Sequence, residues 1–451
     1  MNATTHCYGT TLAVRLEAVP TAVAQERPLS IAFLLDNSGS MEGPRMDAVK
    51  RTLHAARSLF RSGDRVTLVI FSEVARVLHD HLTMTNDGIE AFYTAVDGIR
   101  ADASTNLSAG IEALFGCGRD YDLVIVLTDG MVNAGITSTA GLRAMILGAA
   151  GSNSGLAFHA LGYGADHNRT LLRDIATRSL GTYTFVESNE ILPVAMADTL
   201  SGARAECLRN VRVSPPAGWT CLEAAGECVG NLMPGRDYWC VFTRPEALPS
   251  GTSDAGVVMV STTTAGVALV TQPVVARPLE EMTPEVTEQL FRARIAAEMV
   301  ALSNQAETSG RVTTGRLATL RTELEALPEA VRTRPLMLRL AGQIAEILSM
   351  IPTVVPEEDH APAIRGLRTH GMGLGLGHPP LHAPAMARLA SNAAVLCTQR
   401  GVYESPSAAA GEEDDPLSRV SFFSTPSQRV SSSAVRSTYT RSVTDPSTGP
   451  S

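Results

Sequence analysis

Between residues 29 and 186 the sequence repeats short, fully apolar runs that are separated by amphipathic segments. The apolar runs are Ile31–Leu35, Val66–Phe71, Leu123–Leu127 and Leu156–Leu161. Apolar runs without polar alternation are typical of parallel strands whose two faces are both buried. The pattern therefore predicts a parallel sheet that is covered on both sides.

The segments between these runs have the spacing of amphipathic helices. Apolar residues recur every three or four positions from Met46 to Leu59, and the pattern ends at the turn Ser62-Gly63-Asp64. Further helices are expected at residues 87–99, 106–115, 137–150 and 168–179, before a last strand at 182–186. Strands that alternate with helices predict an α/β fold with a doubly wound, mostly parallel sheet over residues 29–204.

The rest of the chain changes character several times, and 451 residues are too many for a single core. Residues 1–28 are expected to form an N-terminal segment with one strand at 10–19. Residues 205–278 contain short β-like runs between Pro and Gly residues, which predict a small β-rich domain. Residues 279–403 are helical in pattern as far as Met350, so an α-helical extension is expected. Ser, Thr and Pro dominate residues 404–451, which we expect to be mostly disordered.

Polar oxygens follow the first apolar run directly. Asp36, Ser38 and Ser40 lie at positions i, i+2 and i+4 immediately after Ile31–Leu35. In a doubly wound fold, functional groups gather at the carboxyl ends of the strands. Carboxylate and hydroxyl oxygens are hard ligands that suit Mg²⁺ or Mn²⁺. Gly39 is expected to let the loop turn sharply, so that both hydroxyls face the same point.

Two further segments are expected to end at the same edge of the sheet. Asp129 follows the apolar run Leu123–Leu127, and the loop that contains Thr105 precedes an expected helix. Together these segments make one group of candidate ligands for a divalent cation: Asp36, Ser38, Ser40, Thr105 and Asp129.

The order and separation of these residues resemble the metal-ion-dependent adhesion site of von Willebrand factor A domains. The pattern Asp-x-Ser-x-Ser, the loop threonine and the strand-end aspartate all match, and the likeness extends to about residue 200. The resemblance implies that Ser38, Ser40 and Thr105 coordinate the metal directly, whereas Asp36 and Asp129 act directly or through water. It also implies that an Asp or Glu of a partner protein completes the coordination.

The later regions resemble, more weakly, the Vwaint-type extension that follows the A domain in plant RING-type ubiquitin ligases and related microbial proteins. Those ligases carry a cysteine-rich RING ahead of the A domain, whereas only Cys7 precedes Asp36 here. Ligase activity is therefore not carried over. A RING-less adaptor in a ubiquitin-ligase complex is kept as an alternative hypothesis.

The net charge and the distribution of apolar residues indicate which class of partner the protein binds and in which compartment it lies. A net charge of −9 argues against general affinity for nucleic acid, which needs a basic surface. The N-terminus has no apolar signal-peptide core, and no stretch approaches the roughly 20 apolar residues of a membrane span. We expect an intracellular, cytoplasmic protein that binds a protein partner, with no nucleic-acid partner and no membrane span. The oligomeric state is not readable from these features.

Other interpretations of the same residues are weaker. Asp36 and the serines could cap a helix, and Ser38 could be a nucleophile, but no histidine lies nearby in sequence and no G-x-S-x-G or H-E-x-x-H motif occurs. A metal-dependent hydrolase that uses the cation as a Lewis acid is a further alternative, which the missing general base disfavours. We therefore expect a non-enzymatic, metal-dependent binding module that serves as an adaptor or scaffold. Three features are assigned no metal or phosphate: the widely spaced Cys221, Cys228 and Cys240, the pair His79 and His81, and the loop Gly371–Gly377, which lacks the lysine of a P-loop.

Overall fold

The computed structural model describes most of the chain up to residue 350 and short segments beyond it. The described residues are 1–18, 27–102, 104–129, 132–150, 156–163, 167, 169–178, 181–186, 188–223, 228–234, 236–252, 256–261, 270–309, 312–350, 401–402, 433–440 and 443. The loop Gly371–Gly377 lies outside them.

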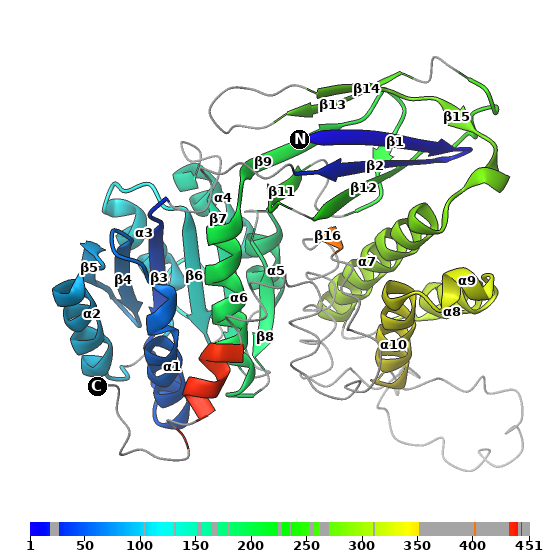
Figure 1. Cartoon of the computed structure of the whole chain (residues 1–451). Coiled ribbons are helices and arrows are strands. Elements are labelled where there is room, and N and C mark those ends of the chain that lie inside the picture. Colours follow the sequence, from blue (N-terminus) through cyan, green and yellow to red (C-terminus); the bar gives the residue numbers. More distant parts are fainter. Residues whose placement is uncertain are drawn as a thin grey trace, which may run out of the picture.

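Within the described residues, a six-stranded sheet forms the centre of the segment that follows residue 27 (Figure 1). Its order is β5-β4-β3-β6-β7-β8, and all neighbours are parallel except β5, which is antiparallel to β4. The strands are β3 (Ser30–Asp36), β4 (Arg65–Phe71), β5 (Ala75–Thr83), β6 (Leu123–Thr128), β7 (Ala157–Tyr163) and β8 (Tyr183–Val186). The predicted doubly wound, mostly parallel sheet is confirmed. Edge strand β5 was not predicted, because most of its side chains are partly or fully exposed and form no apolar run.

Helices cover both faces of this sheet, as Figure 1 shows. One face packs against α1 (Pro44–Ala55), α2 (Asn86–Gly98) and α6 (Ile191–Ala205). The other packs against α3 (Leu107–Gly116), α4 (Thr139–Ala150) and α5 (Arg169–Arg178). Helix α6 was not predicted. It is buried on nearly all sides, so it lacks the polar face by which an amphipathic helix is recognised in sequence.

Two smaller sheets face each other over a shared core and form the β-rich part of the molecule. One has the order β10 (Thr220–Cys221), β12 (Asp237–Thr243), β2 (Thr11–Glu17), β1 (Asn2–Tyr8) and β15 (Ala276–Arg277). The other has the order β11 (Cys228–Leu232), β9 (Leu208–Ser214), β13 (Val257–Ser261) and β14 (Val270–Pro273). The N-terminal residues, expected to be a segment of their own, thus supply two strands to this part. In addition β16 (Gly401–Val402), expected in the helical extension, pairs with β12.

The helical extension contains α7 (Pro284–Ser309), α8 (Gly315–Glu325), α9 (Glu329–Arg332) and α10 (Pro335–Met350). These helices share one apolar cluster and lie in the part of the chain that was expected to be helical as far as Met350. Helix α7 also packs on the β-rich part, where Val286 contacts Tyr8, Ala13 and Trp239. The extension is therefore joined to the β-rich part by a common apolar contact.

Residues 433–440 form an ordered helix within the C-terminal region that was expected to be mostly disordered. This helix is drawn in red in Figure 1 beside α1 and α6. Val435 and Tyr439 lie four positions apart on one helix face, are 0% and 4% exposed, and pack with Ala55 and Ala197. The Arg51 guanidinium also lies 5.8 Å from the centre of the Tyr439 ring. The sequence did not predict this helix, because two apolar side chains at helical spacing are a weak indication of a helix in a Ser-rich segment. The helices that it packs against are also distant in sequence.

Removal of residues 433–451 is expected to change the free energy of unfolding by at most about 1 kcal/mol. Burial of Val435 and Tyr439 contributes about 1.5–3 kcal/mol each, whereas ordering the eight residues of the helix costs about 1 kcal/mol or more per residue. The two apolar contacts offset only part of this cost and the hydrogen bonds within the helix must offset the rest, so we expect marginal docking. Urea unfolding of the full chain and of a chain ending at Ser432 measures the difference. A loss of several kcal/mol would show that this helix is an integral part of the core.

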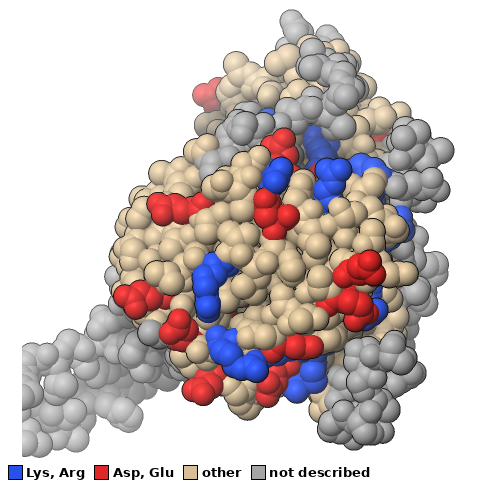
Figure 2. All heavy atoms as spheres, turned by 90° about the vertical axis from the view of Figure 1, so that its left-hand side faces the viewer, with Lys and Arg blue, Asp and Glu red and all other residues tan. Residues whose placement is uncertain are grey.

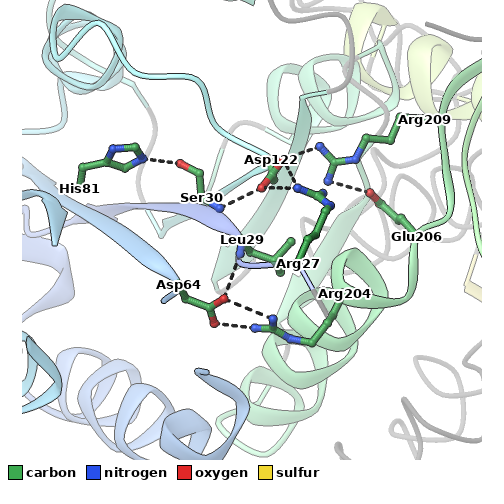
Figure 3. A network of polar contacts seen from close by, with 9 residues as sticks. All are labelled: Arg27, Leu29, Ser30, Asp64, His81, Asp122, Arg204, Glu206 and Arg209. Carbon is green, nitrogen blue, oxygen red and sulfur yellow. Dashed lines mark hydrogen bonds and ion pairs between the residues drawn. The ribbon is translucent and has the colours of Figure 1, made fainter. Parts of the chain in front are cut away.

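Polar contacts join the amino ends of the sheet strands to the connection between α6 and β9 (Figure 3). Asp64, directly before β4, is fully buried and accepts hydrogen bonds from the Leu29 and Arg61 backbone N–H groups at 2.9 and 2.8 Å. Arg204 at the end of α6 donates to the same carboxylate at 2.6 Å. The buried carboxylate thereby ties α6 to the start of β4.

Asp122 has the corresponding place before β6. It accepts from the Ser30 N–H at 2.9 Å, from Arg27 at 3.0 Å and from Arg209 at 2.5 Å, and Arg209 also pairs with Glu206 at 3.1 Å (Figure 3). Both carboxylates lie at the amino ends of the strands. The opposite, carboxyl edge is the one that carries the candidate metal ligands.

Candidate metal site

Asp36 is the last residue of β3 and is held by hydrogen bonds on both carboxylate oxygens. Oδ1 accepts the Ser38 backbone N–H at 2.8 Å, and Oδ2 accepts the Thr128 hydroxyl at 2.5 Å. Its side chain is 0% exposed, and burial raises the pKa of Asp36 to about 6, against the lowering effect of these hydrogen bonds. A nearby cation would favour the charged form of such a carboxylate.

Ser38, Ser40 and Asp129 form a continuous row of oxygen atoms. The two serine Oγ atoms are 3.1 Å apart, and the Ser40 hydroxyl donates to Asp129 Oδ1 at 2.7 Å. Adjacent ligands of an octahedral Mg²⁺ lie about 2.9 Å apart, because the Mg–O distance is about 2.0–2.1 Å. Ser38 and the Asp129 side chain are buried, whereas Ser40 is exposed. The oxygen atoms thus have a spacing that is compatible with Mg²⁺, and the group opens to solvent at Ser40.

The turn in this loop is made differently from the expectation for Gly39. Gly39 begins the 3-10 turn η1 (Gly39–Met41) and is not among the glycines with positive φ. The residue with positive φ is Gly43, at +76°, which immediately precedes α1. Gly43 therefore provides the left-handed conformation that redirects the chain into the helix.

Thr105 lies in a loop that is hydrogen-bonded to the Asp36 loop. The Asp102 N–H donates to the Asn37 carbonyl at 2.7 Å, and Asn133, from the loop after β6, accepts the Thr105 N–H at 3.0 Å. Thr105 itself is 3% exposed. Helix α3, which follows, approaches the sheet closely, because a Cβ on Gly110 would lie 2.8 Å from Leu34 Cδ1. Hydrogen bonds thus connect the loop after β3, the loop that contains Thr105 and the loop after β6. They also join Asp36, Ser38, Ser40 and Asp129 in one continuous series.

Two residues that contact the site were not among the expected ligands. Thr128 lies at the end of β6, and its hydroxyl donates to Asp36. Its position directly before Asp129 in the sequence could have indicated that it contacts the site. Arg45 forms an ion pair with Asp129 and lies 3.3 Å from the Ser40 carbonyl. No sequence pattern marks Arg45, because the contact depends on how α1 lies against the end of β6.

Other candidate metal groups receive no support in the described part of the chain. There, no cluster of three or more His, Cys, Asp or Glu could hold a metal, so any cation at this site needs hydroxyl ligands. Cys240 is buried and Cys221 is partly buried, and the side chain of Cys228 is outside the described residues. His79 contacts the Ala91 carbonyl at 3.2 Å, and His81 contacts the Ser30 hydroxyl at 2.8 Å. The two imidazoles thus have separate partners.

The charges on the surface give no sign of a nucleic-acid site on the face shown in Figure 2. Lys and Arg are interspersed there with Asp and Glu, and no continuous basic patch is seen on that face. Ion pairs such as Arg119–Asp80 at 2.9 Å and Arg57–Glu90 at 2.6 Å join elements at the β5 edge.

A comparison with protein-family models identifies the segment that carries this site. Residues 30–195 match the model of the von Willebrand factor type A domain. This segment is a von Willebrand factor A domain. The chain is 26% identical over 166 residues to an uncharacterized protein of Synechocystis and, also over 166 residues, to inter-alpha-trypsin inhibitor heavy chain H3 of Mus musculus. These matches cover 36% and 34% of this chain, and 38% and 18% of the relatives.

The likeness in fold extends beyond the A domain. A von Willebrand factor type A protein from Catenulispora acidiphila has a TM-score of 0.57 and 19% identity, over 78% of this chain and 88% of that one. The ArnB paralog VWA2 from Sulfolobus acidocaldarius has a TM-score of 0.54 and 13% identity, over 88% and 97% of the two chains. At these identities the likeness shows the fold alone. In the described residues no helix is long and apolar enough to span a membrane.

Proposed function

We propose that this chain is a metal-ion-dependent protein-binding module. Mg²⁺ or Mn²⁺ would be held by Asp36, Ser38, Ser40, Thr105 and Asp129. The observation that carries the proposal is the row of oxygens at Ser38, Ser40 and Asp129, spaced 3.1 and 2.7 Å apart with Ser40 exposed to solvent. The A-domain family supports it, since these domains often bind proteins through a metal at this edge of the sheet.

Each residue has a distinct part in this proposal. Asp36 holds the loop in shape, because its two oxygens accept from Ser38 N–H and from Thr128. Ser38 and Ser40 contribute neutral oxygens, and Asp129 orients Ser40 by accepting its hydroxyl hydrogen. Neutral ligands leave most of the cation's charge uncompensated, so the bound cation supplies an electrophile for a carboxylate. A partner's Asp or Glu would therefore be the group recognised.

The proposal assigns binding and no catalysis. The Ser38 hydroxyl contacts the Ser40 hydroxyl, and in the described part of the chain no contact joins an imidazole to either serine. A serine nucleophile needs such a base. We place this adaptor inside the cell, in keeping with the free thiols of Cys7, Cys117 and Cys207. The ubiquitin-adaptor hypothesis rests on resemblance alone and has no separate structural support.

An affinity pulldown in Mg²⁺ and in EDTA tests this function directly. Partners that bind through the cation are expected to be lost in EDTA and from the double variant Ser38→Ala/Ser40→Ala. Adding Asp- or Glu-containing peptides should compete, whereas the matched Asn and Gln peptides should not. Partners that bind equally well in EDTA, or to the double variant, would refute the metal-dependent mechanism.

A further inference from the structure

Arg45 places a positive charge on the carboxylate of the candidate metal site. It is the second residue of α1, and its Nη1 forms an ion pair with Asp129 Oδ2. The Asp129 side chain is 0% exposed, whereas that of Arg45 is 39% exposed. A buried carboxylate is stable in its charged form only when it is paired or hydrogen-bonded. Arg45 therefore acts as the counter-ion of Asp129.

The ion pair is one of three contacts that hold the guanidinium in place. Nη1 also lies 3.3 Å from the Ser40 carbonyl, and the guanidinium carbon lies 5.9 Å from the centre of the Tyr163 ring. Tyr163 is the last residue of β7 and is buried, and burial raises the pKa of its hydroxyl to about 12. The ring is thus uncharged at neutral pH and can attract the cationic side chain through its face. Arg45 is held at the same carboxyl edge as the metal ligands.

Asp129 is shared between two groups through its two oxygens. Oδ1 accepts the hydroxyl of Ser40, a proposed metal ligand, and Oδ2 is bound to Arg45. A divalent cation beside Ser40 would meet a guanidinium on the same carboxylate, and like charges at such a separation repel each other. The cation and Arg45 therefore compete for the negative charge of Asp129.

We propose that Arg45 is a built-in competitor of the metal and sets the cation affinity of the site. This inference rests on the proposed function, since it concerns the same cation. In the metal-free protein Arg45 neutralises Asp129 and stabilises the loop. On metal binding it gives up or weakens this ion pair. The site is thereby tuned to respond to changes in divalent-cation concentration instead of being permanently filled.

Calorimetric titration of the full chain with MgCl₂ and with MnCl₂ tests the proposal. Arg45→Gln is expected to bind either cation about ten-fold more tightly than the unchanged protein, which corresponds to about 1.4 kcal/mol. Arg45→Lys keeps the charge and should remain within a few-fold of the unchanged protein. Arg57→Gln is the matched control, because Arg57 pairs with Glu90 away from the site and its loss should not alter metal affinity.

Thermal unfolding provides a second readout that does not depend on measuring the affinity. In EDTA, Arg45→Gln should unfold at a lower temperature, because Asp129 loses its counter-ion. The stabilisation by Mg²⁺ should then be larger in Arg45→Gln than in the unchanged protein. Equal or weaker metal binding by Arg45→Gln, with binding by the unchanged protein intact, would overturn the competitor role alone. Absence of metal binding in both proteins would overturn the proposed function as well.

Discussion

Replacement of Arg292 by methionine is expected to lower the free energy of unfolding by about 3–5 kcal/mol. Arg292 in α7 forms an ion pair with Glu223 of the β-rich part, and both side chains are 0% exposed. Its Nε also donates to Gln289 at 2.7 Å within the same helix. Methionine leaves the Glu223 carboxylate buried without this partner, and an uncompensated charge in the protein interior is strongly destabilising.

Urea unfolding followed by tryptophan fluorescence measures the loss in free energy of unfolding and reports on the β-rich part. The two tryptophans of the chain, Trp219 and Trp239, both lie in the β-rich part. Arg321→Met is the matched control, because Arg321 pairs with Glu325 on the surface with 50% and 56% exposure, and its loss should cost about 0.5 kcal/mol or less. The double variant Arg292→Met/Glu223→Leu should recover much of the loss, since it removes both charges together. If Arg292→Met and Arg321→Met cost the same, the buried ion pair does not stabilise the contact between α7 and the β-rich part.

The second large effect is expected on metal binding. Asp36→Asn should weaken the affinity for Mg²⁺ and Mn²⁺ by about 100-fold or more, which exceeds the usual loss from altering an outer-shell group. Asparagine keeps the shape of the side chain and can still accept the Ser38 N–H hydrogen bond. The negative charge is lost, however, and with it the attraction for the cation. Calorimetric titration of both proteins measures the change.

A control separates the role of the charge from a general effect on folding. Asp47 is exposed in the first turn of α1, near the site in sequence but with its side chain in solvent, so Asp47→Asn should bind the metal as the unchanged protein does. The thermal unfolding midpoint of Asp36→Asn in EDTA should show that the domain is folded. Unchanged metal affinity in folded Asp36→Asn would exclude Asp36 from the site.

The candidate metal ligands could be predicted from the sequence because each lies in a short segment with a recognisable pattern. Asp36 and Asp129 each follow a buried apolar run, so the ends of β3 and β6 could be placed at one edge before any contact was known. The spacing of Ser38 and Ser40 after Asp36 then predicted oxygens facing one point, as their 3.1 Å separation shows. The loop does turn at Gly39, but without a positive φ, and the positive φ that glycine tolerates is found at Gly43 instead.

The sequence by itself determined the parallel sheet of the A domain, the helices around it and the polar groups at its carboxyl edge. Apolar runs, helical spacing and strand-end side chains are properties of short segments, so they can be recognised without knowledge of the tertiary contacts. The tertiary structure alone decided that β1 and β2 join β12, that residues 433–440 dock on α1 and α6, and that Arg45 reaches Asp129. Each of these depends on packing between distant segments, where many alternative partners have similar local patterns.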